Sequence, residues 1–117
     1  KHQYLPEALQ IQSLETDVWR SVNALEAVLS LEKGKTSRLS RTRPKIKRVG
    51  EQRTVEDLVS AKRASTGFRM LMDRNMAHRT FEAVALRHPE RFDDAVLKAA
   101  RARLDGENVK AELYLSR

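Results

Sequence analysis

The sequence contains no cysteine and few aromatic residues, which make up 5% of its 117 positions. The absence of thiols excludes disulfides, thiolate metal sites and a cysteine nucleophile. No apolar run approaches the roughly 20 residues that a membrane-spanning helix needs, and the sequence shows no signal-peptide pattern. We therefore expect a cytoplasmic protein without membrane contact, and its low aromatic content predicts an aliphatic core.

Residue patterns typical of active sites are also scarce. His78 and Glu82 have the i,i+4 spacing of a helical ligand pair, but no third ligand follows at a recognisable distance. The segment "EKGKTS" ends like a phosphate-binding loop, yet Leu29 occupies the position at which that motif requires its first glycine. We expect a protein that is not an enzyme, with no catalytic residue, no bound metal and no cofactor.

Positive charge is concentrated in one stretch, residues 33–53. The chain has a net charge of +7, with 23 basic and 16 acidic residues. The stretch alone carries nine basic residues against the single acid Glu51, so the remainder of the chain is nearly neutral. Such a local concentration points to an anionic partner more strongly than a high overall charge does. The nine candidate binding residues are Lys33, Lys35, Arg38, Arg41, Arg43, Lys45, Lys47, Arg48 and Arg53.

The first part of the chain has the periodicity of a long helix. From Ile11 to Leu29 the apolar residues recur every three or four positions, Pro6 suits a first helical position, and Gly34 suits a C-terminal cap. We predict one unbroken helix from Pro6 to Lys33, about 40 Å long, on which the rest of the chain packs. The alternative is a break in this helix near residues 13–17.

Shorter helical patterns follow the basic stretch. We predict a helix capped by Thr54 and stopped by Gly67, then a short one from Phe68, another capped by Thr80, and a last one that opens at Pro89. The chain is therefore predicted to be a single all-α domain over residues 1–117, an irregular bundle of four to five helices packed on the long N-terminal helix, with residues 33–53 as a basic connector.

The C-terminal segment, residues 107–117, alternates apolar and polar residues. This period is typical of a strand, and no other part of the sequence shows one. Three interpretations stay open: a short helix, a loose tail, or an edge that pairs with a second chain.

The centre of the basic stretch, "RTRPK" at residues 41–45, resembles the Arg-Gly-Arg-Pro core of an AT-hook. An AT-hook is a short peptide that lies in the minor groove of A·T-rich DNA, and the resemblance implies that Arg41 and Arg43 would enter such a groove. Thr42 stands where the AT-hook has glycine. As an alternative, a short helix after Pro44 would turn Ile46 and Val49 toward the core and its cations toward solvent.

Three interpretations of the basic stretch remain. In the first, its cations neutralise phosphates, and the protein is a small nucleic-acid-binding accessory or regulatory protein whose partner is DNA or RNA. In the second, the protein is a non-catalytic helical interaction module that binds an acidic protein or forms a homo-oligomer. In the third, the arginines are structural and pair with acids of the chain itself. The acids expected in that last role are Glu15, Asp17, Asp93 and Asp94.

Overall fold

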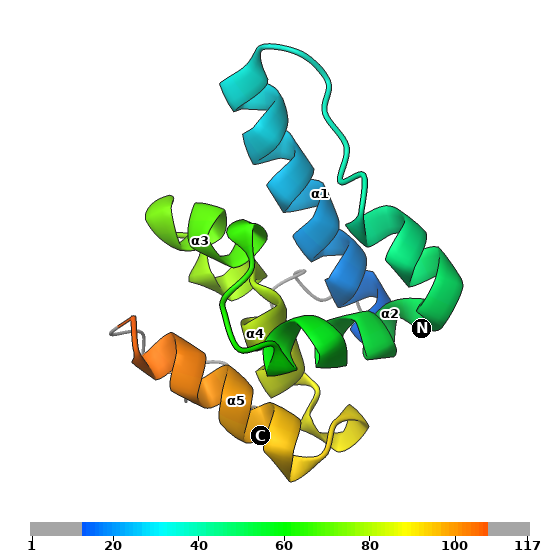
Figure 1. The fold of residues 1–117 in the computed structure, drawn as a ribbon, viewed down its shortest axis with the longest axis vertical. Coiled ribbons are helices and arrows are strands. Elements are labelled where there is room, and N and C mark those ends of the chain that lie inside the picture. Colours follow the sequence, from blue (N-terminus) through cyan, green and yellow to red (C-terminus); the bar gives the residue numbers. More distant parts are fainter. Residues whose placement is uncertain (1–12, 108–117) are drawn as a thin grey trace, which may run out of the picture.

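The computed structural model describes residues 13–107, which form an all-α fold without strands in that range (Figure 1). The all-α prediction is therefore confirmed. None of the helices in the described part combines the length and apolarity that crossing a bilayer requires. Except for Glu107, the alternating segment 107–117 lies outside the described residues. The elements in chain order are α1 (Leu14–Lys33), α2 (Thr42–Ser60), α3 (Thr66–Asp73), η2 (Ala77–Arg79), α4 (Phe81–Arg87), η3 (Pro89–Arg91) and α5 (Asp94–Asp105).

Helix α1 begins later than the sequence pattern predicts. Ser13 has an extended backbone, and its side chain caps the helix by accepting a hydrogen bond from the Thr16 N–H at 3.1 Å. The prediction of an unbroken helix from Pro6 is therefore wrong, and α1 is roughly 30 Å long. Its end is as predicted, because Gly34 adopts the left-handed conformation with φ 69°. Helices α2, α3 and α4 all pack against α1.

The hydrophobic core surrounds α4, which lies at the centre of the bundle (Figure 1). The α4 residues from Glu82 to Leu86 are all buried. A helix of seven residues is too short to be stable alone, so its contacts with α1, α2 and α5 must stabilise it. Thr80 caps α4 as predicted by accepting a hydrogen bond from the Ala83 N–H at 3.1 Å. Valine and leucine form most of the surrounding core, which includes Val18, Val22, Val55, Val59, Val84, Leu86 and Leu104.

Helix α2 is bent at Gly50, which has φ 90° and ψ 167°. This backbone conformation is essentially restricted to glycine. Before the bend α2 runs beside α1, and after the bend it crosses α4 and α5 (Figure 1). The predicted cap at Thr54 is wrong, because Thr54 lies inside the helix and its hydroxyl donates a hydrogen bond to the Gly50 carbonyl at 2.8 Å.

The sequence pattern predicted that Gly67 stops a helix, and this prediction is wrong. Helix α2 already ends at Ser60, and Gly67 lies in the first turn of α3. A Cβ atom at Gly67 would be 2.6 Å from Cδ2 of Leu25. Glycine at this position therefore permits the close approach of α3 to α1.

The end of α4 is attached to α1 through Asp17. The buried Asp17 carboxylate accepts hydrogen bonds from Arg87 at 2.8 and 3.1 Å and lies 2.9 Å from Nε2 of His88. Burial raises the pKa of Asp17, but the interactions with Arg87 and His88 outweigh it and hold the pKa below its usual range. His88 lies at the end of α4, so this contact joins the end of α4 to the first turns of α1.

We predict that Gly50→Ala lowers the free energy of unfolding by about 1–3 kcal/mol. No atom lies within 4 Å of the added Cβ, so the cost arises only from the positive φ. Gly34→Ala is the matched control, because its left-handed conformation costs an L-residue roughly 1 kcal/mol. Urea denaturation measures the free energy of unfolding of both variants. If Gly50→Ala lost no more stability than Gly34→Ala, the backbone conformation at the bend would not require glycine.

We predict that Asp17→Asn lowers the free energy of unfolding by about 3 kcal/mol at neutral pH, because Arg87 loses its buried counter-charge. The pKa of Asp17 is depressed in the folded state, so its contribution is fully present above the unfolded pKa of about 3.9 and is lost as the pH falls through the lower folded value. The difference between wild type and variant should therefore shrink in acid. Urea midpoints measured at pH 7 and in strong acid test this, and a pH-independent difference would contradict it.

Candidate nucleic-acid interface

The structure divides the basic stretch into three parts. Lys33 is the last residue of α1, residues 34–41 form a loop, and residues 42–53 belong to α2. The connector predicted for residues 33–53 is thus only the eight-residue loop, and the alternative of a helix after Pro44 is confirmed. Ile46 is buried, as that alternative predicted, whereas Val49 is 40% exposed. Most of the stretch is therefore helical, and the cations of residues 42–53 project from α2.

The start of α2 differs electrostatically from the other α-helix starts of the described chain. Ser13, Ser65, Thr80 and Asp93 each cap a helix with a side-chain oxygen. Arg41, at the N-cap of α2, makes no such hydrogen bond, and the first turn contains no acidic residue. The positive end of the helix dipole therefore adds to the charge of the nearby cations.

Arg43 is held inside the structure by Glu26 of α1. Its Nε and Nη2 atoms donate to the two oxygens of Glu26 at 2.5 and 2.8 Å, and its guanidinium group lies 5.2 Å from the centre of the Trp19 ring. Trp19 in turn donates a hydrogen bond from Nε1 to Glu51 at 2.9 Å. Trp19 is therefore part of the α1–α2 contact.

Glu26 also fixes the loop. Its Oε2 atom accepts a hydrogen bond from the backbone N–H of Leu39 at 2.9 Å. The hydrogen bonds from Arg43, and to a lesser degree that from Leu39, hold the pKa of Glu26 below its usual range against the effect of burial. Nearer the tip, the backbone N–H of Ser37 donates to the Ser30 hydroxyl at 2.9 Å. Residues 37–43 thus have a defined course along α1.

Two further cations of the stretch are paired with Asp57. Lys45 lies 2.7 Å and Arg53 3.0 Å from its carboxylate oxygens. The acids expected to pair with the basic stretch were therefore the wrong ones. Glu15 pairs with Arg91, Asp17 with Arg87 and His88, and Asp93 caps α5, while Asp94 lies exposed in its first turn.

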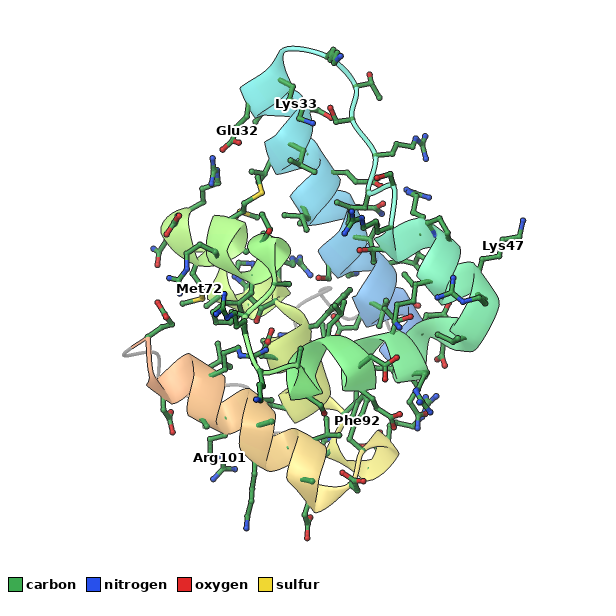
Figure 2. All side chains as sticks on the ribbon, in the orientation of Figure 1. Glu32, Lys33, Lys47, Met72, Phe92 and Arg101 are labelled. Atoms are coloured by element: carbon green, nitrogen blue, oxygen red, sulfur yellow. The ribbon has the colours of Figure 1, made fainter. Side chains whose placement is uncertain are left out.

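Six cations of the stretch are exposed and form no ion pair with any residue in 13–107. We call this set the basic face. Figure 2 shows Lys33 at the end of α1 and Lys47 projecting from the first half of α2, whereas Arg101 projects from α5 at the other end of the molecule. The basic face consists of Lys33, Lys35, Arg38, Arg41, Lys47 and Arg48.

The AT-hook resemblance does not extend to the backbone. Residues 42–45 form the first turn of α2, so they do not have the extended course of a peptide lying in a minor groove. The resemblance would also insert Arg43 into the minor groove, but the guanidinium group of Arg43 is already paired with Glu26. Nucleic-acid contact by the stretch stays a prediction, and the geometry leaves six of its nine cations accessible for it.

The described residues contain no group of three or more side chains that could hold a metal ion. The chain matches no protein-family model, no curated protein and no solved structure. The interpretation of the basic face therefore depends on its own geometry and charge.

The sequence contained a signal for the Glu26 contact that the pattern analysis missed. Leu14, Val18 and Val22 recur every four residues on the buried side of α1, and Glu26 is the next position of that row. An acid in a buried row needs a partner, and the nearest surplus of positive charge is the basic stretch. The spacing does not identify which of the nine cations is that partner.

We predict that Glu26→Ala lowers the free energy of unfolding by about 2 kcal/mol, because it removes hydrogen bonds to a charged group and leaves Arg43 without its partner. Asp57→Ala, which removes the more exposed acid paired with Lys45 and Arg53, should cause a much smaller loss. Chemical denaturation compares the two variants. Equal losses would mean that Glu26 does not organise the loop.

Proposed function

We propose that this protein is a small, non-catalytic nucleic-acid-binding accessory or regulatory protein that contacts the phosphate backbone through its basic face. The observation that supports the proposal is the presence of six exposed cations, none ion-paired within residues 13–107, in a chain whose remaining charge is nearly balanced. Lys and Arg that neutralise phosphates release condensed counterions, which supplies most of the affinity of non-specific binding. A cytoplasmic location stays a prediction.

The geometry also supports a particular mode of contact. The cations of α2 are carried by a helix, and Arg38 and Arg41 flank Leu39, whose N–H is bound by Glu26. Contacts from such a fixed surface need less ordering on binding than contacts from a flexible arm. The start of α2 has no side-chain cap and no acid in its first turn, so the positive end of the helix dipole lies beside Arg41. We therefore expect backbone-dominated binding without strong base selectivity.

The salt dependence provides the quantitative test. If all six cations contact phosphates of a duplex, log affinity should fall with log salt with a slope of about −5. Fluorescence anisotropy of labelled duplex DNA, single-stranded DNA and RNA, repeated across a salt series, measures this slope. The double substitution Arg38→Ala/Arg41→Ala should weaken binding at least about tenfold and make the slope shallower by about 2.

The control is Lys98→Ala/Arg101→Ala, which removes the same amount of charge from exposed positions of α5. It should change affinity less than about twofold and leave the slope unaltered. Equal effects of the two double variants would show that only net charge matters and would refute the assignment to the basic face. The absence of any binding at low salt would refute the nucleic-acid function itself.

The second candidate is the helical interaction module that binds an acidic protein or self-associates. The observation that favours it is Leu31, which is 84% exposed near the end of α1, two residues before Lys33. An exposed leucine offers apolar surface that a protein partner would bury and that a phosphate backbone would not. A complex that survives nuclease treatment and is disrupted by Leu31→Ser would favour this candidate over the first.

A further inference from the structure

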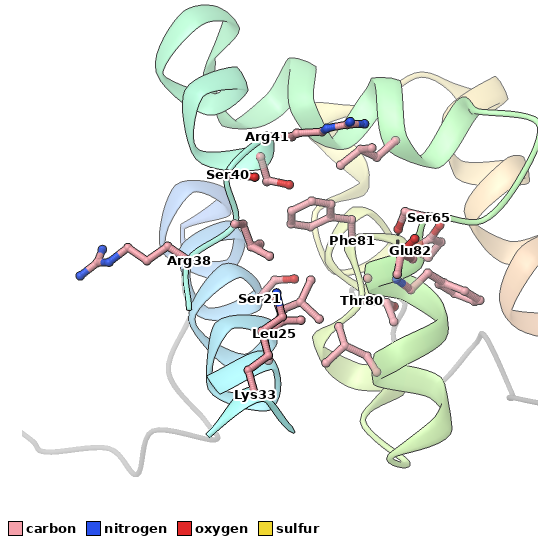
Figure 3. Close-up of a pocket in the computed structure, with 18 residues that line it drawn as sticks. Ser21, Leu25, Lys33, Arg38, Ser40, Arg41, Ser65, Thr80, Phe81 and Glu82 are labelled. Carbon is pink, nitrogen blue, oxygen red and sulfur yellow. Dashed lines mark hydrogen bonds between the residues drawn. The ribbon is translucent and has the colours of Figure 1, made fainter. Parts of the chain in front are cut away.

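A pocket of about 450 Å³ lies between α1, the basic loop, the end of α2, α3 and the start of α4 (Figure 3). Its volume is within the range of small-molecule sites in proteins. Its floor is apolar and is contributed by four helices, so residues far apart in sequence meet there. The floor residues are Leu25, Leu29, Leu58, Phe68, Leu71 and Phe81, and Leu39 of the loop adds a further apolar side chain to the lining.

Most deeper hydroxyl groups of the pocket are already engaged. Ser21 donates to the Arg79 carbonyl at 2.5 Å, and Thr80 donates to the Ala77 carbonyl at 2.8 Å. Ser65 accepts the N–H of Phe68 at 3.0 Å as the cap of α3. These groups have satisfied their main hydrogen bonds, so the interior presents mainly hydrocarbon to a ligand.

One end of the pocket carries unused polar groups on three consecutive residues. Arg41 has no ion pair within residues 13–107, and the hydroxyls of Ser40 and Thr42 make no hydrogen bond there. In Figure 3, Ser40 and Arg41 lie together at this end, and the Arg41 side chain extends along the edge of the pocket. The guanidinium group of Arg38 points away, and Lys33 lies at the opposite end of the pocket.

Among residues 13–107, Glu82 is the only acid that lines the pocket, and it is buried. Its carboxylate accepts a hydrogen bond from Arg103 at 2.9 Å, and Arg103 also donates to the carbonyls of Leu58 and Ala61. Burial raises the pKa of Glu82, and the pairing with Arg103 opposes this effect. The negative charge of Glu82 is therefore compensated from outside the pocket, whereas Lys33 and Arg41 form no ion pair within residues 13–107.

We propose that this pocket binds a small amphipathic anion, whose apolar part fills the leucine and phenylalanine floor and whose carboxylate lies against Arg41, Ser40 and Thr42. Charge complementarity determines the class of ligand, because an apolar cavity with an uncompensated cation at its mouth favours a molecule that combines hydrocarbon with a single negative group. The guanidinium group and the two hydroxyls supply donors for both oxygens of a carboxylate.

The probe is octanoate, compared with octanamide, which has the same shape without the charge. Isothermal titration calorimetry should give a dissociation constant of roughly 0.1–1 mM for octanoate, as expected of a ligand of this size, and binding at least about tenfold weaker for octanamide. In NMR spectra, octanoate should shift the amide resonances of Gly67 and Thr42, which line the pocket, more than those of α5.

Three variants test the placement. Arg41→Gln should weaken octanoate binding by about five- to tenfold, because it removes the charged donor at the mouth. Arg38→Gln is the matched control, since it removes the same charge from the same loop at a side chain that points away, and it should change binding less than twofold or so. Leu29→Trp adds volume inside the pocket and should abolish binding while the far-UV circular dichroism spectrum stays unchanged.

Several results would overturn the proposal. No octanoate binding at about 10 mM would mean that the pocket is not a ligand site. Equal affinities for octanoate and octanamide would refute the role of charge, and equal effects of Arg41→Gln and Arg38→Gln would refute the role of Arg41. Because these measurements contain no nucleic acid, their outcome is independent of the function proposed for the basic face.

Discussion

The carboxylate of Glu26 fixes the arrangement of the basic part of this protein. It binds the guanidinium group of Arg43 with both oxygens and also accepts the N–H of Leu39. One side chain of α1 thereby sets the end of the loop, the start of α2 and the distance between the two helices. A buried carboxylate is costly unless it is fully compensated, so this arrangement is well defined only when both partners are present. Because Glu26 holds Arg43, the end of the loop and the start of α2 are fixed, and they in turn determine where the exposed cations lie.

This constraint divides the positive charge of the stretch into two kinds. Arg43, Lys45 and Arg53 neutralise acids of the fold and contribute to its structure. The other six are exposed to solvent, form no ion pair within residues 13–107 and repel one another. The start of α2 is also locally unfavourable, because it has no side-chain cap and cations lie near the positive end of its helix dipole. Such unfavourable local choices are expected at functional sites, where binding of a ligand compensates for them.

Much of the fold could be predicted from the sequence because helix signals are local. Thr80 and Gly34 act as terminal residues, as their types and positions indicated. The last helix was predicted to open at Pro89, but residues 89–91 form the short element η3, and α5 begins at Asp94 with Asp93 as its cap. The wrong predictions concern residues whose role depends on distant parts of the chain. Gly67 was taken for a helix stop because spacing does not show that Leu25 would occupy the space of its side chain. Thr54 was taken for a cap because the bend at Gly50 has no periodic signature.

The candidate site was predicted less well, for the same physical reason. Composition located the basic stretch, and the apolar spacing of Ile46 allowed a helix within it. The separation of the nine cations into paired and free sets depends on Glu26 and Asp57, which lie outside the stretch and lack a spacing rule relative to it. The pocket beside Arg41 could not be predicted at all, because its walls come from four helices whose packing no local pattern encodes.

The bend at Gly50 has a consequence for how the chain tolerates changes in length. After Gly50, the buried side chains of Val55 and Val59 fix how this half of α2 is rotated about its axis. One residue inserted between Gly50 and Val55 would turn both valines by about 100° away from the core. The tip of the loop, at Lys35 and Thr36, is exposed, and within the described residues its side of the loop is joined only locally, by a hydrogen bond from the Ser37 hydroxyl to the Lys35 carbonyl at 3.2 Å. Insertions and deletions should therefore accumulate at that tip and be absent after the bend. The reach of the basic face can change in evolution while the core beneath it stays the same.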